Sequence, residues 1–333
     1  MEAYIKDIAY YLPERVVGNA EIIAEFPEWT DDKIVDKIGV RERHVAAEGE
    51  TSADMAVKAA EILFSNSKTK REDIDFVLFC TQTPDYLLPT SACLIQDRLG
   101  LRRNIGALDY NLGCSGYIYG LSLAQGLLAS GTAKNVLLLT AESYNKHLHP
   151  KDKGNRTIFG DAAAATLISA NGFAKIGTFA LGTDGSGAEN LIIQTGGARH
   201  FAPKGELTYA ENGSPVSSDH IYMNGQEIYL FTIENVPPLV ASTLQKNQLT
   251  DNQIDLYIFH QANTYMLNYL RRKLKIEPER FYINMADTGN TVSSSLPIAI
   301  CKAMSDGSLK SGMKCLITGF GVGYSWGGTV LEF

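Results

Sequence analysis

The sequence has few of the features that mark secreted, metal-bound, membrane or nucleic-acid-binding proteins. Its 5 cysteines are odd in number and lack CxxC spacing, so neither a disulfide framework nor a zinc site is expected. The 30 basic and 37 acidic residues give a formal charge of −7, which argues against nucleic-acid binding. No apolar run approaches the roughly 18 residues of a membrane-spanning helix, and the start lacks the apolar segment of a secretory signal. We expect a cytoplasmic protein without a bound metal, a membrane or a nucleic-acid partner.

What is present is an ordinary globular composition, with 45% hydrophobic and 20% charged residues in 333 residues. That length suggests two domains of about 150 residues or one duplicated unit. Short, continuously apolar runs alternate with helical patterns from end to end, which is typical of an α/β fold with strands buried on both faces. These runs lie at 75–80, 135–140, 255–259 and 314–318.

The order of the predicted segments repeats along the chain. Each series has a strand, a second strand, a glycine-containing corner, a long helix and a third strand. The members are 75–80, 106–111, Cys114 and 135–140 in the first series, and 255–259, 281–285, Asn290 and 314–318 in the second. We infer an internal duplication, because a repeated order of elements indicates repeated structure.

The duplication predicts an N-terminal half at 1–172 and a C-terminal half at 173–333. No low-complexity linker separates them, so we expect the halves to pack as one body. The stretch 194–222 is rich in Gly, Ser, Pro and polar residues. It predicts a long surface excursion, which is either a binding loop or a plain insertion.

Cys114 is the candidate nucleophile. It lies between glycines in Gly113-Cys114-Ser115-Gly116, at the junction of a predicted strand and a predicted helix. A helix N-terminus favours the thiolate, which is the nucleophilic form of cysteine. The alternative, a small buried cysteine with no chemistry, remains open from this corner alone.

His260 and Asn290 are the candidate partners of the thiol. His260 follows the predicted strand at 255–259, where an imidazole can point into a ligand crevice. Asn290 lies at the corner that the repeat makes equivalent to Cys114, although an Asx-Gly sequence by itself indicates only a turn. A thiol, an imidazole and an amide from three strand ends suit acyl transfer through a thioester.

Two further segments have more than one reading. The glycine-dense tail at 319–328 resembles a dinucleotide fingerprint, but a strand-like segment at 329–333 follows where that fingerprint needs a helix. Its glycines better suit backbone N–H groups that approach an oxyanion. The basic cluster at 271–275 is either a solvated helix face or a docking patch for an acidic partner.

Six motifs together resemble those of β-ketoacyl-acyl-carrier-protein synthase III, a family of the thiolase-like superfamily. The resemblance spans nearly the whole chain, from Tyr4 to Phe333. The motifs are Gly39–His44, the Cys114 corner, Ile158–Asp161, His260–Asn263, Gly289–Thr291 and the tail from Phe320 to Gly327.

The resemblance implies an α/β fold of the thiolase-like type, a duplicated five-layer αβαβα arrangement, in a homodimer. It implies that Cys114 takes an acyl group from acyl-CoA or an acyl-carrier protein. His260 and Asn290 would then stabilise the enolate that malonyl-acyl-carrier protein forms on decarboxylation. The product would be a 3-oxoacyl-carrier protein, with no cofactor besides these substrates. Backbone N–H groups of Cys114 and Val322 would hold the thioester oxyanion, with Val322 at a usual glycine position.

The resemblance also implies residues that bind CoA or the carrier protein. Lys33, Lys37 and Lys153 stand where many members have Trp or Arg, and Tyr265 replaces a carrier-docking Arg. Because Lys cannot stack as Trp or Arg can, adenine binding should be weaker. Leu88 would close the acyl pocket of the partner subunit. The full set of binding positions is Lys33, Lys37, Lys153, Gly225, Asn263, Arg272 and Lys273.

Three other functions compete with condensation. A specialised acyltransferase would pass the acyl group from Cys114 to an oxygen or nitrogen nucleophile without decarboxylation. An inactive partner subunit would not need the intact thiol, imidazole and amide. A Cys-His hydrolase needs an activated water, and no residue in the sequence indicates a water-activating acid.

Overall fold

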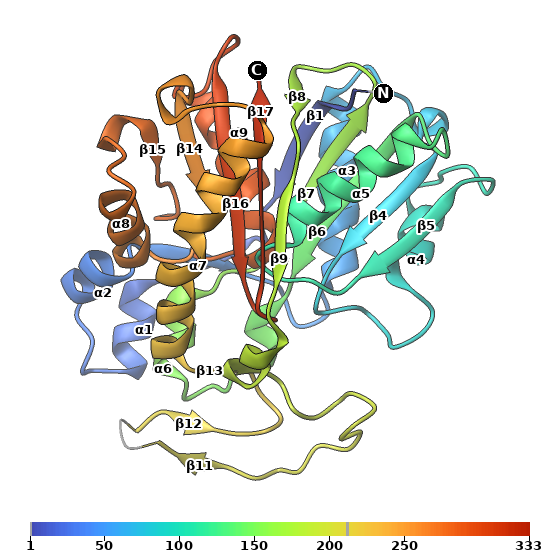
Figure 1. The fold of residues 1–333 in the computed structure, drawn as a ribbon. Coiled ribbons are helices and arrows are strands. Elements are labelled where there is room, and N and C mark those ends of the chain that lie inside the picture. The colour runs from blue at the N-terminus through green and yellow to red at the C-terminus, as the bar shows by residue number, and fades with distance from the viewer. Residues whose placement is uncertain (1, 211–212) are drawn as a thin grey trace.

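The computed structural model describes residues 2–210 and 213–333 and shows central strands with helices packed against them (Figure 1). The main helices are α1 (Asn19–Glu25), α2 (Asp31–Lys37), α3 (Ser52–Asn66), α4 (Ser91–Arg98), α5 (Gly116–Ala129), α6 (Lys153–Ile158), α7 (Gly225–Lys246), α8 (Thr264–Lys273) and α9 (Ser295–Ser305). The longer strands are β1 (Tyr4–Tyr11), β2 (Arg15–Gly18), β3 (Glu42–Val45), β4 (Phe76–Cys80), β5 (Gly106–Tyr110), β6 (Asn135–Glu142), β7 (Ala162–Ser169), β9 (Ala180–Thr183), β14 (Leu256–Phe259), β16 (Lys314–Gly321) and β17 (Ser325–Glu332). The shorter ones are β8 (Ala174–Ile176), β10 (Leu191–Ile192), β11 (Thr208–Tyr209), β12 (Pro215–Val216), β13 (Tyr222–Met223) and β15 (Phe281–Tyr282).

The strand order reads the same way from both ends of the main sheet, β15-β14-β16-β17-β8-β1-β7-β6-β4-β5. In the N-terminal half, β4 is parallel to β5 and β6, and β7 is antiparallel to β6 and β1. In the C-terminal half, β14 is parallel to β15 and β16, and β17 is antiparallel to β16 and β8. The predicted duplicated α/β fold is therefore confirmed, whereas the boundary between residues 172 and 173 stays a prediction.

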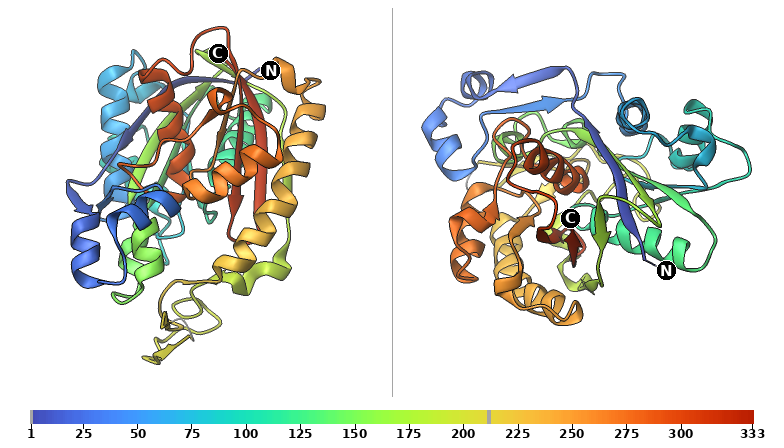
Figure 2. Two further views of the ribbon diagram at one scale, coloured as in Figure 1. Left: turned by 90° about the vertical axis from the view of Figure 1, so that its left-hand side faces the viewer. Right: turned by 90° about the horizontal axis from the view of Figure 1, so that it is seen from above.

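The helices form three layers that alternate with the two halves of the sheet (Figure 2). Helices α5 and α9 lie in the middle and contact strands of both halves. Tyr117, Leu121, Leu296 and Ile300 from these two helices belong to one buried apolar cluster with strand residues of both halves. Burying one such side chain stabilises the fold by roughly 1.5–3 kcal/mol. This gain explains why the sequence is apolar where it forms the middle of the molecule.

The outer layers bury separate apolar clusters against the sheet. On one side α3 packs on the N-terminal half, with Ala56 and Leu63 among the buried residues that contact Phe79 and its neighbours. On the other side α7 and α8 cover the C-terminal half, where Val236 and Leu267 are buried. Together these layers give the five-layer αβαβα arrangement.

The predicted strands agree with the observed ones except at 281–285. There β15 contains only Phe281 and Tyr282, because Asn284 donates its backbone N–H to the Gln261 side chain at 2.8 Å instead of continuing the ladder. The predicted excursion at 194–222 extends from one end of the molecule and contains the small β11–β12 hairpin (Figure 1). Within the described ranges, no helix has the length and apolarity to span a membrane.

Candidate active site

Cys114 lies at the corner between β5 and α5, where the strand ends and the chain turns. The N–H of Gly116 donates to the Gly113 carbonyl at 2.8 Å, which closes the turn around the thiol. Gly321, at the end of β16, faces the sulfur, since a Cβ built there would lie 3.1 Å from Cys114 Sγ. Cys114 is buried, with 8% of its surface exposed. The C-terminal half therefore approaches the thiol as closely as a glycine allows.

His260 follows β14 and is held at both its backbone and its ring. Its N–H donates to the Thr318 carbonyl at 2.8 Å. Its Nδ1 lies 2.7 Å from the Ser295 hydroxyl at the start of α9, so Nε2 is the ring nitrogen left for other partners. Burial lowers the pKa of His260 to about 3, so the imidazole is neutral near pH 7.

Asn290 is fixed by the segment that precedes β7. Its N–H donates to the Ile158 carbonyl at 2.9 Å, and its own carbonyl accepts from the Gly160 N–H at 3.0 Å. Its side-chain Oδ1 accepts the Val292 N–H at 2.9 Å, which leaves the amide NH₂ as a donor. Val292 has a φ of 52°, an unusual value for a β-branched residue and one often associated with functional sites.

The three predicted residues line one cavity of about 150 Å³. Its other walls are mainly apolar, as is usual for a ligand site with a few fixed polar groups. Ile158 and Asn263 also line a second hollow, which reaches Lys37 and Tyr265 and provides an approach from the surface. The remaining wall residues of the cavity are Tyr144, Phe159, Leu191, Met223, Gly225, Ile228, Thr232, Ala262, Met266, Phe320 and Gly321.

The expected thiolate at the helix N-terminus is wrong for the substrate-free site. Burial raises the pKa of Cys114 to about 12, and the nearby Glu142 carboxylate acts in the same direction. The helix N-terminus is a local effect of about 0.3–1 kcal/mol at exposed sites, which is smaller than the cost of burying a charge. The sulfur is therefore held as a thiol.

Glu142 is a buried acid that the sequence analysis missed. It ends β6 and accepts the Gln82 N–H at 3.0 Å and the Ser293 hydroxyl at 3.1 Å, so it joins the two halves beside the thiol. Burial raises its pKa to about 8. The sequence signal for Glu142 was an acidic residue close behind the apolar run at 135–140. Its hydrogen-bond partners come from distant segments, so the signal did not show its role.

The two predicted oxyanion donors lie at neighbouring turns. Neither the Cys114 nor the Val322 N–H donates to a backbone carbonyl in the part of the chain that the structure describes. Val322 follows β16, and its Cγ1 would lie 2.7 Å from a Cβ built on Gly113. It lines a neighbouring hollow, which shares Tyr144 and Leu191 with the catalytic cavity, and not the catalytic cavity itself.

The predicted binding residues divide into three positions. Gly225 and Asn263 line the cavity, and Asn263 also caps α8 by accepting the Met266 N–H at 2.8 Å. Lys37 lies at the approach hollow. The remaining cations are not brought to the cavity and lie along the outer surface: Lys33, Lys153, Arg272 and Lys273.

Trp29 is an aromatic residue near Lys33 that the sequence analysis missed. The Lys33 ammonium lies 5.0 Å from the centre of its ring, and the adjacent Glu28 carboxylate pairs with Lys153 at 2.9 Å. A flat surface is therefore present beside the lysines that replace Trp and Arg. Leu88 is 83% exposed and is not among the residues that line the cavity around Cys114.

This duplicated fold, with a buried thiol, a neutral imidazole and a carboxamide in one cavity, defines a thiolase-like acyltransferase. Models of 3-oxoacyl-[acyl-carrier-protein] synthase III match residues 108–185 and, for its C-terminal part, 244–333. The chain is 36% identical to a Clostridium perfringens β-ketoacyl-[acyl-carrier-protein] synthase III, over 97% of this chain and 96% of that one. It belongs to the 3-oxoacyl-[acyl-carrier-protein] synthase III family.

Solved structures give the same assignment. A crystal structure of a 3-oxoacyl-(acyl-carrier-protein) synthase III superposes with a TM-score of 0.97 at 46% identity, covering 100% of both chains. The Thermus thermophilus β-ketoacyl-[acyl carrier protein] synthase III gives a TM-score of 0.88 at 33% identity over 99% of each chain. The expected thiolase-like fold and enzyme class are thereby confirmed.

Proposed function

We propose that the chain catalyses a decarboxylative Claisen condensation, in which a Cys114-bound acyl group reacts with malonyl-acyl-carrier protein. The observation that carries this proposal is the single buried cavity shared by Cys114, His260 and Asn290. The relatives are named as synthases, which supports condensation over acyl transfer to an oxygen or nitrogen nucleophile. The reaction would begin fatty acid biosynthesis.

The first half-reaction loads the thiol. Cys114 Sγ attacks the thioester carbonyl of acyl-CoA or an acyl-carrier protein, and the displaced thiol leaves with the proton that Cys114 loses. The tetrahedral oxyanion would accept hydrogen bonds from the Cys114 and Val322 backbone N–H groups, neither of which donates to a backbone carbonyl of a described residue. The mainly apolar walls favour a neutral thioester over a charged thiolate.

The second half-reaction forms the carbon–carbon bond. Malonyl-carrier protein loses CO₂, and the enolate oxygen accepts hydrogen bonds from His260 Nε2–H and the Asn290 NH₂. With Ser295 donating to Nδ1, the neutral ring carries its hydrogen on Nε2. The carbanion attacks the acyl-cysteine carbonyl and expels Cys114 sulfur, which regains a proton. Every step uses these side chains and two thioesters, so the proposal includes no cofactor.

The thioester end of each substrate would reach Cys114 through the hollow at Lys37, with the carrier protein docked outside it. The basic end of α8, with Arg272 and Lys273, lies on the surface and suits an acidic carrier. Lys33 and Lys153 lie beside Trp29 and would meet the nucleotide of CoA. Tyr265 lies at the same hollow, at the position where the family resemblance would place a carrier-docking Arg.

We further propose a homodimer in the cytoplasm. Tyr86, Leu87 and Leu88 form an apolar loop and are 61%, 76% and 83% exposed, and a partner subunit would cover it. Leu88 would then close the acyl pocket of that partner. The chain's cysteines are free thiols, and a reducing compartment would keep Cys114 in that state.

Intact-mass spectrometry tests both half-reactions in one series. The protein is incubated with acyl-CoA and acyl-carrier thioesters of different chain lengths, and the mass gain of the loaded enzyme is recorded. Malonyl-carrier protein is then added, and CO₂ and 3-oxoacyl product are measured. Condensation predicts loss of the added acyl mass with stoichiometric CO₂. Acyl transfer to an alcohol or amine without malonyl consumption would contradict it.

A further inference from the structure

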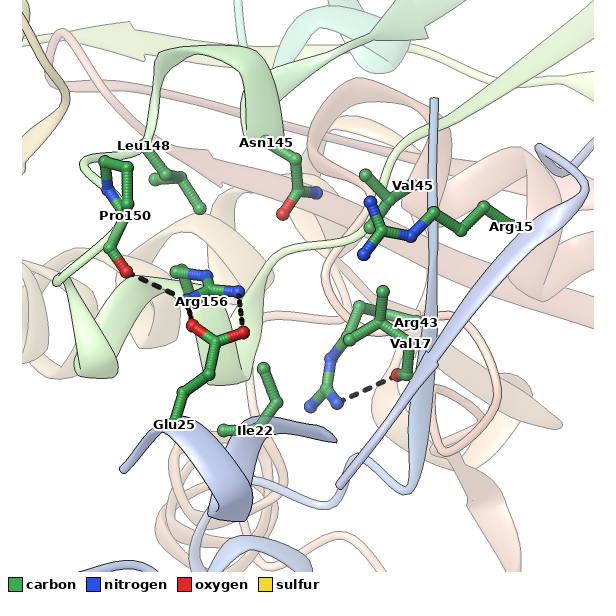
Figure 3. Close-up of a pocket in the computed structure, with 10 residues that line it drawn as sticks. All are labelled: Arg15, Val17, Ile22, Glu25, Arg43, Val45, Asn145, Leu148, Pro150 and Arg156. Atoms are coloured by element: carbon green, nitrogen blue, oxygen red, sulfur yellow. Dashed lines mark hydrogen bonds and ion pairs between the residues drawn. The ribbon is translucent and has the colours of Figure 1, made fainter. Parts of the chain in front are cut away.

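A second cavity, which we call the arginine cavity, lies away from the catalytic one. It has a volume of about 260 Å³ and shares no wall residue with the cavity around Cys114. Its walls come from β2, β3, α1, α6 and the loop before α6 (Figure 3). The wall residues are Arg15, Val17, Ile22, Glu25, Arg43, Val45, Asn145, Leu148, Pro150 and Arg156.

The charge of this cavity is unbalanced. Its walls contain three guanidinium groups and one carboxylate. The carboxylate of Glu25 pairs with Arg156, and the guanidinium of Arg15 at the rim pairs with Glu21 at 2.8 Å. Both acids are partly exposed, with side-chain exposures of 45% and 44%. The exposed Arg15–Glu21 pair contributes little. Glu25 accepts from both terminal nitrogens of Arg156, so that pair is the stronger of the two, and the walls still have a net positive charge.

Arg43 is the buried charge that these pairs leave uncompensated. It is only 1% exposed, and its donors reach neutral acceptors, namely the Val17 carbonyl at 3.1 Å, the Asn19 side-chain oxygen at 3.0 Å and the Thr157 carbonyl at 2.8 Å. Its Nε has no hydrogen-bond partner among the described residues. Burial and the nearby Arg156 lower the pKa of Arg43 to about 10. A buried cation without a carboxylate gains from any anion placed beside it.

We propose that the arginine cavity binds a small, multiply charged free anion of the phosphate class. Guanidinium groups match phosphate oxygens in geometry and charge. Figure 3 shows the side chains of Arg15, Arg43 and Arg156 around the same space. The volume of about 260 Å³ has room for inorganic phosphate or pyrophosphate.

The cavity also touches an element of the catalytic site. Arg156 lies on α6, and Arg43 donates to the carbonyl of Thr157 on the same helix. The next residue, Ile158, lines the catalytic cavity and accepts the Asn290 N–H at 2.9 Å. An anion in the arginine cavity would therefore brace the helix that positions Asn290.

Isothermal titration calorimetry with inorganic phosphate and pyrophosphate at low ionic strength tests the proposal. The wild type should bind one anion per chain, and Arg156→Gln and Arg15→Gln should each weaken binding at least tenfold. Bound anion should also raise the melting temperature of the wild type, because a ligand of the native state stabilises it. Arg43 is left intact, since its backbone contacts join three segments.

Two control variants separate this site from other cationic surfaces. Arg71→Gln removes a guanidinium that pairs with Glu61 on the distant α3, and Lys37→Gln removes a cation at the catalytic approach. Both should bind pyrophosphate as the wild type does. Three results would overturn the proposal: no binding at millimolar anion, equal weakening by Arg71→Gln, or loss of binding in Lys37→Gln with binding kept in Arg156→Gln. Circular dichroism of each variant confirms that it is folded.

Discussion

The two repeat-equivalent corners of the molecule have the same topology and opposite chemistry. The first corner, between β5 and α5, presents the Cys114 thiol. The second, between β15 and α9, presents the Asn290 amide, and the preceding strand of the same half adds His260. One half therefore supplies a group that can form a covalent bond, and the other supplies neutral hydrogen-bond donors.

A duplicated fold can thus assign the two steps of one reaction to its two halves. Both corners end at the same cavity, and the helices that follow them, α5 and α9, share one apolar cluster. The thiol half needs a close approach of backbone, which Gly321 permits. The amide half needs fixed donors, which Val292 and Ser295 orient. Substitutions at the two corners should therefore break different half-reactions.

The largest effect is expected at the first corner. Cys114→Ala should abolish acyl loading, because no other cysteine among the described residues lines the cavity, and condensation should fall by at least about 1,000-fold. The removal of one small buried side chain should leave the fold intact. Intact-mass spectrometry measures loading, with Cys93→Ala, an exposed cysteine, as the control. A Cys114→Ala protein that still acquires the acyl mass would place the nucleophile elsewhere.

The next effect is expected at the second corner. Asn290→Ala and His260→Ala should each slow malonyl decarboxylation by roughly 100- to 1,000-fold, the usual loss for one oxyanion donor. Acyl loading of Cys114 should persist, since neither amide nor imidazole is its nucleophile. Decarboxylation is followed by CO₂ release and loading by mass. Full decarboxylation in both variants would show that the two corners do not divide the work as proposed.

The pH dependence of stability distinguishes the buried imidazole from an exposed one. An unfolded histidine gains its proton near pH 6.5, whereas burial lowers the pKa of folded His260 to about 3. Between these values the unfolded chain binds more protons. Stability from this group is therefore full above pH 6.5 and falls with pH by up to about 1.4 kcal/mol per unit.

Urea unfolding at several pH values measures this contribution. The free energy of unfolding of the wild type is compared with that of His260→Asn, and only the difference between the two curves is used, since acids elsewhere also titrate. The difference should shrink as the pH falls below 6.5. Parallel curves down to pH 4.5 would mean that His260 is protonated as easily in the folded chain as in the unfolded one.

Much of the site could be predicted because its key residues lie at the ends of recognisable strands. Cys114, His260 and Asn290 each follow an apolar run or a glycine-containing corner, and repeated order suggested that the corners meet. The signals for Glu142 and Ser295 were weaker, because their partners come from other parts of the sequence. A residue's partner across two halves depends on packing, which local patterns do not encode.

The charge state of the Cys114 thiol also depends on contacts that the local sequence does not show. The helix N-terminus was visible in the sequence, and it favours a thiolate. The burial that raises the pKa of Cys114 to about 12 results from layers contributed by the whole chain, including Gly321 and Glu142. Likewise, β15 ends at Tyr282 because the Gln261 side chain accepts the Asn284 backbone N–H. Tertiary contacts override both local expectations.

The smallest effect is expected at Ser295, which acts through His260. Ser295→Ala removes the hydroxyl at 2.7 Å from Nδ1, and a hydrogen bond of this kind contributes about 1 kcal/mol. The neutral ring is then free to place its hydrogen on either nitrogen, so malonyl decarboxylation should slow by roughly fivefold to tenfold. Acyl loading should not change, and Ser305→Ala, on the exposed side of the same helix, serves as the control. An equal loss in both half-reactions would mean that Ser295 supports the fold of the corner and not the tautomer of the imidazole.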